Sequence, residues 1–277
     1  MPMFRMSLRS SSGSRFLSES PTFVIADLHL DGNGKAATQL LLDFLQGPVR
    51  KARALYILGD LFESWIGDDA PLAPAEMLAQ GLREVSSAGV EIYFLVGNRD
   101  FLLGEAYCKQ AGMTLVSEPV HLQHGGGSLI LMHGDVLCTD DLDYQAFRSR
   151  VRNPEWQQKT LAKPAWLRRL LARMLRFISK RRNRGKPEFI MDVNATAVES
   201  TMLALSTRTL IHGHTHRPAI HRLEIDHDHA LRAVLGDWHE NRGSAIELRD
   251  DRLRLLELGR DSNEQLELTV RDQAPLQ

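Results

Sequence analysis

Five short motifs in this chain carry side chains that bind divalent metal ions, and each motif directly follows an apolar run. The motifs are Asp27-Leu28-His29, Gly59-Asp60, Gly97-Asn98-Arg99-Asp100, His133-Gly134-Asp135 and Gly213-His214-Thr215-His216. Carboxylate oxygens and imidazole nitrogens together suit Mn²⁺, Fe²⁺, Zn²⁺ or Co²⁺, and no thiolate joins them. The candidate metal ligands are Asp27, His29, Asp60, Asn98, His133, His214 and His216.

This set of ligands predicts hydrolytic chemistry on phosphorus. Seven ligands exceed one tetrahedral site but suffice for two metal ions that share a bridging carboxylate. Two ions ~3.5–4 Å apart can ionise a water molecule between them and neutralise a phosphoryl oxygen during in-line attack. Each motif is weak by itself, because an acid after a strand usually caps a turn. All five together indicate metal-assisted hydrolysis of a phosphoester or phosphoanhydride.

The elements that must position these motifs read as an α/β core. Strands are predicted at 23–26, 55–58 and 92–96, with helices at 35–45 and 74–88 between them. This alternation implies a parallel sheet with crossover helices, and the carboxyl ends of its strands face one crevice. Further strands are expected at 128–132, 209–211, 219–225, 231–235, 244–248 and 253–258.

The domain organisation follows from where this pattern breaks. Residues 141–205 are almost purely helical in pattern, so we expect a helical insertion in a domain spanning 21–260. The first twenty residues hold seven serines and no apolar region of the length found in secretory signals. We expect a disordered leader at 1–20 and a polar tail at 261–277.

Composition restricts the class of protein further. The 277 residues are 43% hydrophobic and 25% charged, as in an ordinary globular protein, and no run reaches the ~18 apolar residues of a transmembrane helix. Two cysteines, Cys108 and Cys138, fit a reducing compartment, although a single pair stays open. Aromatic residues make up 6% of the chain, which argues against single-stranded nucleic-acid binding by stacking.

Basic charge is concentrated inside the helical insertion. Residues 148–186 hold fourteen basic residues and one acid, whereas the rest of the chain holds 20 basic and 34 acidic residues. Within this block, Trp166 to Ile178 has the pattern of an amphipathic helix with leucines on one half and arginines on the other. Two interpretations stay open: a core-packed helix with a solvated basic face, or a helix for a membrane surface or lipid-bearing ligand.

The order of the motifs resembles the calcineurin-like metallophosphoesterase superfamily. Most members carry Gly-Asn-His, whose histidine is a general acid, but this chain has Arg99 at that position. The chain also resembles the bacterial UDP-2,3-diacylglucosamine diphosphatases of lipid A biosynthesis, from about Thr22 to about Leu248. The stretches that carry this narrower resemblance are DLHL, GDLFE, FLVGNRDFLLG, HGDVLCTDD, IMDVNATAV and HGHTHRP.

The resemblance implies a fold, a reaction and a set of site residues. The fold is a four-layer αββα sandwich with an inserted helical cap, and the reaction cleaves the pyrophosphate of UDP-2,3-diacylglucosamine into lipid X and UMP. Two Mn²⁺ ions would be bridged by Asp60; Asp27, His29 and His216 would complete the first site, and Asn98, His133 and His214 the second. The substrate contacts would be Asn98, Arg99 and His214, also the expected catalytic groups, with Asp141 and the cap residues Ser179, Asn183 and Lys186.

Arg99 itself favours a pyrophosphate substrate. A guanidinium cannot be a general acid, because it does not give up its proton in proteins. A sugar 1-phosphate needs little protonation to leave, so a fixed guanidinium that stabilises charge on the pyrophosphate suits it better. Simple monoesters and alkyl diesters are therefore less favoured.

An anionic nucleotide-lipid also explains the basic helix, because such a substrate at an anionic membrane needs both cations and an apolar face. We expect the helix from Trp166 to Ile178 either to line the acyl-chain groove or to enter the membrane. The expected location is cytoplasmic, with peripheral attachment to the cytoplasmic face of the inner membrane. No nucleic-acid partner is expected.

Three other functions stay open. A metallophosphoesterase for soluble pyrophosphates, such as dinucleoside polyphosphates or CDP-alcohols, would share every metal ligand and differ in the cap. A nuclease is favoured by the basic block but disfavoured by the overall acidity and few aromatic residues. A non-catalytic scaffold is disfavoured because all seven positions hold competent ligands.

Overall fold

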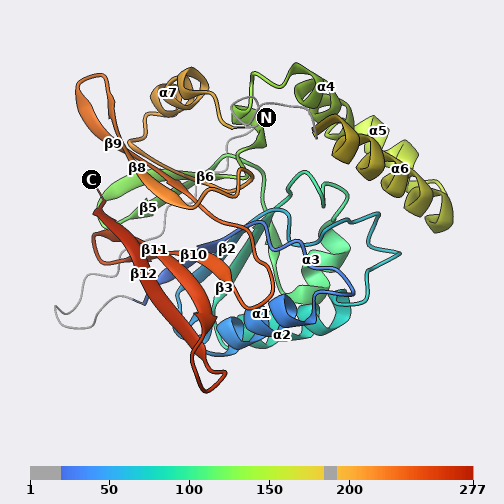
Figure 1. The fold of residues 1–277 in the computed structure, drawn as a ribbon, viewed down its shortest axis with the longest axis horizontal. Helices are drawn as coiled ribbons and strands as arrows, with labels where there is room; N and C mark the ends of the chain where they lie inside the picture. The colour runs from blue at the N-terminus through green and yellow to red at the C-terminus, as the bar shows by residue number, and fades with distance from the viewer. Residues whose placement is uncertain (1–19, 184–191, 277) are drawn as a thin grey trace.

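Two β-sheets lie face to face at the centre of the molecule (Figure 1). The computed structural model describes residues 20–183 and 192–276, apart from the side chains of residues 178–180, 182 and 183. The first sheet has the order β12-β11-β10-β1-β2-β3-β4 and the second the order β5-β6-β7-β9-β8. The strands of the first are β1 (Thr22–Ile25), β2 (Ala54–Leu58), β3 (Glu91–Leu95), β4 (Thr114–Leu115), β10 (Gly243–Arg249), β11 (Arg252–Arg260) and β12 (Leu266–Pro275). Those of the second are β5 (Val120–His124), β6 (Gly127–Met132), β7 (Thr209–His212), β8 (Ala219–Ile225) and β9 (Asp228–Val234).

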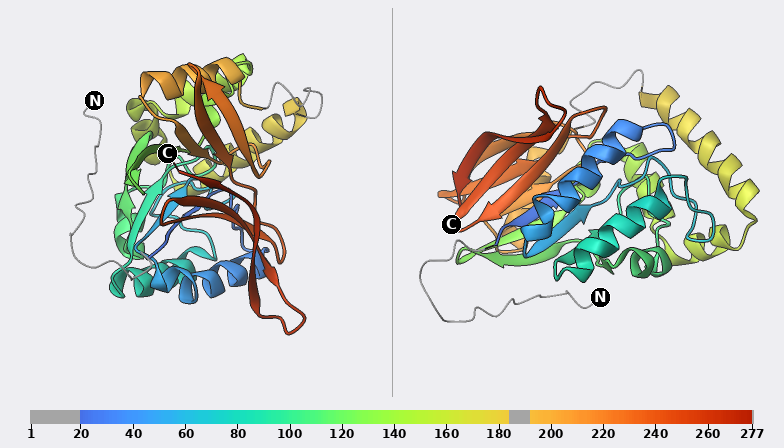
Figure 2. Two further views of the ribbon diagram at one scale, coloured as in Figure 1. Left: turned by 90° about the vertical axis from the view of Figure 1, so that its left-hand side faces the viewer. Right: turned by 90° about the horizontal axis from the view of Figure 1, so that it is seen from below.

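Helices cover the outer faces of both sheets, and Figure 2 shows these layers from two further sides. Helices α1 (Lys35–Gln46), α2 (Ala75–Ser87) and α3 (Glu105–Ala111) pack on the first sheet, and α7 (Ala195–Ala204) packs on the second. Helices α4 (Leu142–Val151), α5 (Pro154–Leu161) and α6 (Ala165–Asn183) extend beyond the sheets as an arm (Figure 1). Short 3₁₀ turns lie at η1 (Val49–Lys51) and η2 (Asp135–Leu137).

Alternation along the strands explains the four layers. In β1, Phe23 and Ile25 pack against the helices, while Val24 packs against the second sheet. In β6, Leu131 packs between the sheets and Ile130 packs toward α7. Because both faces of these strands are buried, their sequences are continuous apolar runs rather than alternating ones. The predicted αββα sandwich is confirmed.

The predicted order of elements agrees with the structure at most positions. Strands β1, β2 and β3 run parallel, with α1 and α2 as the crossover helices. Helix α3 and strands β4, β5 and β12 were not predicted. Strand β12 lies in the segment 261–277 that was expected to be a polar tail, and it pairs antiparallel with β11. The expected leader lies outside the described residues, apart from Ser20.

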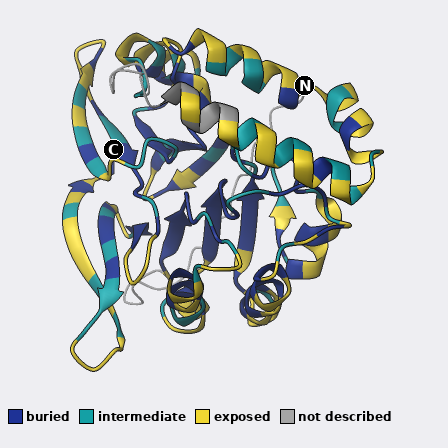
Figure 3. Cartoon of the chain, turned by 45° about the vertical axis from the view of Figure 1, so that its right-hand side comes forward, coloured by how far each residue is buried: buried dark blue, intermediate teal, exposed yellow. Residues whose placement is uncertain are grey.

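The exposure of the residues of helix α6 contradicts one of the two interpretations of its sequence (Figure 3). Trp166, Leu170, Met174 and Phe177 are 50–68% exposed, whereas Arg168 is 3% exposed. The guanidinium of Arg168 donates to Asp69 and to the carbonyl oxygen of Ile66. The interpretation of α6 as a helix with a core-packed apolar face and a solvated basic face is therefore wrong, because the apolar side chains are exposed and a paired guanidinium is buried instead.

No helix in the described ranges is both long and apolar enough to span a membrane.

Candidate metal centre

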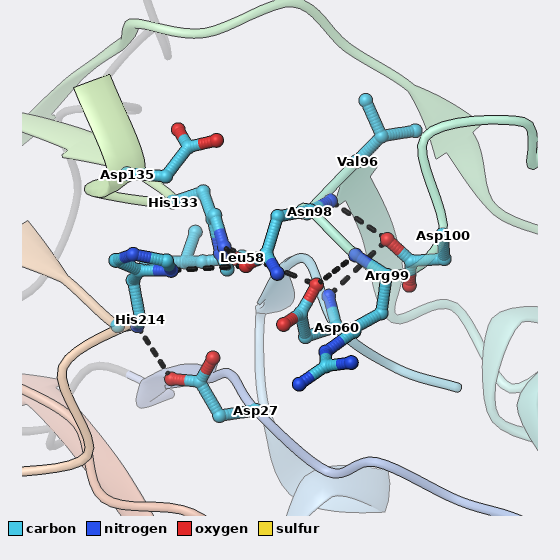
Figure 4. A network of polar contacts seen from close by, with 12 residues as sticks. Asp27, Leu58, Asp60, Val96, Asn98, Arg99, Asp100, His133, Asp135 and His214 are labelled. Carbon is cyan, nitrogen blue, oxygen red and sulfur yellow. Dashed lines mark hydrogen bonds and ion pairs between the residues drawn. The ribbon is translucent and has the colours of Figure 1, made fainter. Parts of the chain in front are cut away.

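The predicted motifs meet where the carboxyl ends of strands from both sheets converge (Figure 4). Asp27, Asp60 and Asn98 follow β1, β2 and β3 of the first sheet. His133 and His214 follow β6 and β7 of the second sheet. The site therefore lies between the two sheets, and each of these side chains follows a buried strand.

The backbone of these loops is held in an uncommon conformation. Five of the candidate metal ligands have a positive φ, although none of them is a glycine: Asp27 (57°), His29 (49°), Asp60 (52°), His214 (68°) and His216 (56°). Left-handed backbone is uncommon outside glycine, although aspartate and histidine adopt it more often than most residues, and it costs about 1–3 kcal/mol at each position, so it persists where surrounding structure enforces it. The loops are thus shaped to aim these side chains at one point.

Two glycines explain how closely the carboxylates approach the opposing loops. A Cβ atom on Gly97 would lie 2.1 Å from Asp60 Oδ1, and one on Gly213 would lie 2.3 Å from Asp27 Oδ2. Real Cβ atoms essentially never approach that closely. Glycine at each position therefore lets a carboxylate lie directly against neighbouring backbone.

Backbone amides fix one oxygen of each carboxylate. Arg99 N donates to Asp60 Oδ1 at 2.7 Å, and His214 N donates to Asp27 Oδ2 at 2.8 Å. The other oxygen of Asp27, Oδ1, is buried and accepts no hydrogen bond from any described residue. A buried carboxylate oxygen without a partner is costly, so this atom indicates a cation position.

A first group of ligands surrounds that oxygen. His29 Nε2 and His216 Nε2 lie 3.2 Å apart, and His216 Nε2 lies 3.6 Å from Asp27 Oδ1. Ligands of one tetrahedral ion with bonds of about 2.1 Å lie roughly 3.4 Å from one another. Ligand atoms of Asp27, His29 and His216 all lie within 4.8 Å of one another, so these residues fit one metal ion.

A second group lies beside the first and shares Asp27 with it. Ligand atoms of Asp27, Asp60 and His133 also lie within 4.8 Å of one another. His133 Nδ1 lies 2.8 Å from the Leu58 carbonyl oxygen, which leaves Nε2 to face the centre. Asn98 Oδ1 lies 2.9 Å from His133 Nε2. The residues therefore suit a pair of metal ions.

His214 completes the cluster, so all seven predicted ligands come together. Its Nδ1 atom lies 2.9 Å from Asn98 Oδ1, and its ring centroid lies 5.0 Å from that of His133. Burial and the nearby charge of His133 lower the pKa of His214 to about 3. Burial also opposes charge on His133, but Asp60, Asp135 and other carboxylates raise its pKa to about 9.

Two carboxylates at the site were not predicted to act there. Asp100 is fully buried and accepts hydrogen bonds from Gly97 N (2.7 Å), Leu61 N (2.7 Å) and Asp60 N (3.2 Å), so it ties two ligand loops together. Burial and the charge of Asp60 raise its pKa to about 6. Glu63 lies 3.2 Å from His29 Nδ1. The one sequence signal for a role of Asp100 and Glu63 at this site is that each acid lies inside one of the motifs quoted above.

A buried ionic network joins helix α4 to the His133 loop. Asp135 is fully buried, lies 2.9 Å from Arg148 Nε and accepts a hydrogen bond from the Tyr144 hydroxyl at 2.8 Å. Glu118 accepts from His133 N at 3.0 Å and pairs with Arg148 at 2.5 Å. The start of the helical arm is thus anchored to a candidate metal ligand.

The expected substrate residues outside the ligand set are placed less fully. The Arg99 side chain is 30% exposed at the edge of the site. Asp141 is buried and caps α4, accepting from Tyr144 N at 3.0 Å. Ser179 and Asn183 belong to α6, but their side chains are not described, and Lys186 lies outside the described residues. Their roles toward substrate stay predictions.

Comparisons with known proteins identify the family. The profile of the calcineurin-like phosphoesterase family matches residues 20–218. The chain is 48% identical over 235 residues to proteins named UDP-2,3-diacylglucosamine hydrolase from Escherichia fergusonii and Shigella sonnei, covering 85% of this chain and 98% of each relative. The solved structure of vacuolar protein sorting 29 from Cryptosporidium parvum matches with a TM-score of 0.47 and 13% identity, over 93% of this chain and 99% of that one. The match to the family profile and the 48% identity to the named relatives show that the chain belongs to the calcineurin-like phosphoesterase family.

Proposed function

We propose that this protein hydrolyses the pyrophosphate bond of UDP-2,3-diacylglucosamine, releasing UMP and 2,3-diacylglucosamine 1-phosphate for lipid A biosynthesis. The observation that carries the proposal is the 48% identity over nearly the whole length of relatives named for this hydrolysis. The converging carboxylates and histidines support it, because they provide the chemistry that such a cleavage requires.

Two Mn²⁺ ions are the proposed cofactors. Asp27, His29, Asp60 and His216 would hold the first ion, and Asp60, Asn98, His133 and His214 the second, with Asp60 as the bridge. Bound there, the metal pair supplies a water-derived nucleophile at neutral pH and neutralises phosphoryl charge. The buried Oδ1 atom of Asp27 and the facing Nε2 atoms of His29 and His216 support this arrangement.

Arg99 is the proposed clamp on the pyrophosphate. Its side chain is 30% exposed, and its Nη1 atom lies 3.9 Å from Glu63 Oε1, which is beyond hydrogen-bonding distance. Donors therefore remain for phosphate oxygens, and a guanidinium fork binds such oxygens in a bidentate manner. The phosphate site would be completed by Asn98 and His214, whose Oδ1 and Nδ1 atoms lie 2.9 Å apart. The remainder of the substrate would be contacted by Asp141, Ser179, Asn183 and Lys186.

We further propose that α6 attaches the protein to the cytoplasmic face of the inner membrane. The exposed stripe of Trp166, Leu170, Met174 and Phe177 supports membrane entry over the lining of an acyl-chain groove, since these side chains point into solvent. Arg169 and Arg173 lie on the same helix, where cations favour an anionic bilayer.

Substrate comparison tests the proposal. UMP release from micellar UDP-2,3-diacylglucosamine should exceed turnover of dinucleoside polyphosphates, CDP-alcohols and DNA by at least about 100-fold in kcat/KM, or about 2.7 kcal/mol of transition-state stabilisation. Equal turnover of a soluble pyrophosphate would contradict the lipid assignment while leaving the metal chemistry intact. The Arg99→His variant should lose pyrophosphatase activity; a variant that gains diesterase activity and keeps the pyrophosphatase would overturn the proposed clamp.

A further inference from the structure

Glu63 contacts three functional parts of the protein at once. Its Oε2 atom lies 3.2 Å from His29 Nδ1, a candidate metal ligand. Its Oε1 atom lies 3.1 Å from Arg176 Nη1 of helix α6 and 3.9 Å from Arg99 Nη1. One carboxylate thus connects the metal centre, the proposed phosphate clamp and the helical arm.

Backbone hydrogen bonds place Glu63 between these groups. Glu63 N donates to the Leu30 carbonyl oxygen at 3.0 Å, next to His29 in the chain. Two residues further on, Trp65 N donates to the Arg99 carbonyl oxygen at 3.1 Å. The backbone of this segment therefore runs between the two loops whose side chains Glu63 faces.

The two nitrogens of His29 face different partners. Nε2 faces His216 Nε2 at 3.2 Å, whereas Nδ1 is buried and makes no hydrogen bond in the described chain, although Glu63 Oε2 lies 3.2 Å from it. Glu63 is thus the acid placed to accept the Nδ1 proton of His29, since 3.2 Å is within donor–acceptor distance. A carboxylate that accepts from a metal-bound histidine fixes the tautomer and raises the basicity of the other nitrogen.

We infer that Glu63 is a positioning residue: its Oε2 atom holds His29 with Nε2 directed at the proposed metal, and its Oε1 atom separately seats helix α6 through Arg176. The inference rests on the proposed metal-dependent function of the same site. It assigns separate effects to the two contacts. Loss of the His29 contact should weaken metal binding, whereas loss of the Arg176 contact should alter substrate binding by the proposed contact residues of α6.

A neighbouring ion pair provides a matched control. Asp69, in the same loop, binds Arg168 of the same helix but contacts none of the candidate ligands in the described chain. If Glu63 only held α6 in place, its replacement would change metal affinity no more than the replacement of Asp69. A carboxylate that positions His29 would differ from Asp69 in metal affinity.

The test is calorimetric titration of chelator-stripped protein with Mn²⁺, without substrate, for the wild type and the variants Glu63→Ala, Glu63→Gln, Arg176→Gln and Asp69→Asn. We expect Glu63→Ala to weaken Mn²⁺ binding by about 10–100-fold. Glu63→Gln retains an acceptor and should recover part of that loss. Arg176→Gln and Asp69→Asn should change the affinity less than about threefold, while Arg176→Gln raises KM for UDP-2,3-diacylglucosamine at saturating Mn²⁺.

The outcomes separate this inference from the proposed function. A loss below about threefold in Glu63→Ala, or an equal loss in Asp69→Asn, overturns the inference even if UMP release is normal. Specific loss of Mn²⁺ affinity at Glu63 supports it even if UDP-2,3-diacylglucosamine is not the substrate. If circular dichroism shows that Glu63→Ala does not fold, Glu63→Gln decides, with a loss of about threefold or more as the threshold.

Discussion

Replacement of Gly97 by alanine should disable the metal centre through one contact. The added Cβ would lie 2.1 Å from Asp60 Oδ1 and 2.4 Å from Asp60 N. An ordinary contact needs about 3.5 Å, so the proposed bridging carboxylate must move by about 1 Å or more. A displacement of that size at reacting groups costs about 100-fold in rate. Overpacking of this buried position should also cost about 1–3 kcal/mol of unfolding free energy.

The assay compares kcat/KM for UMP release, Mn²⁺ affinity and Tm of Gly97→Ala with those of Gly32→Ala. The added Cβ at Gly32 would meet Ala73 Cβ at 3.5 Å, an ordinary contact, so this matched variant should behave like the wild type. Wild-type turnover and Mn²⁺ affinity in Gly97→Ala would contradict this prediction. Such a result would mean that Asp60 does not need its observed position against the β3 loop.

Further predictions concern stability, reactivity, membrane attachment and metal removal. Arg168→Ala should lower the unfolding free energy by about 2 kcal/mol in urea titrations, because it removes charged hydrogen bonds that hold α6; an unchanged midpoint would contradict this. Burial raises the pKa of Cys108 and Cys138 to about 12, so at pH 8 roughly one thiol in ten thousand is ionised, and native protein should react with iodoacetamide far more slowly than protein in urea. The double variant Trp166→Glu and Leu170→Glu should lose binding to anionic liposomes and raise KM; unchanged values would remove the membrane role of α6. Chelation should lower Tm by about 5–10 °C relative to protein with Mn²⁺ at 100-fold its Kd, and an unchanged Tm would argue against a bound metal.

The centre of the fold was predictable because its strands are buried on both faces. The continuous apolar runs of β1, β2 and β3 mark strands, and the polar residues directly after them mark one edge of the sheet. That edge carries Asp27, Asp60 and Asn98 together, as expected. Strand β12 was missed because its exposed surface gives it a mostly polar sequence, although Leu266, Leu268 and Val270 alternate with polar residues at the period of a strand.

Features that depend on contacts between distant segments could not be predicted. The pattern of α6 defines an apolar face but not its direction, which is set by Arg168 pairing with Asp69 from a loop far away in the chain. The same holds for Asp100 and Glu63. Their sequence positions show acids inside motifs, whereas their roles arise from backbone amides and a histidine supplied by other loops.

The central claim is tested most directly by measuring UMP release from UDP-2,3-diacylglucosamine by chelator-stripped protein, with and without added Mn²⁺. We expect negligible release without metal, and restored release of UMP together with 2,3-diacylglucosamine 1-phosphate once Mn²⁺ is added. Release that is equally fast without metal, or none with Mn²⁺ while another nucleotide pyrophosphate or diester is hydrolysed, would contradict it.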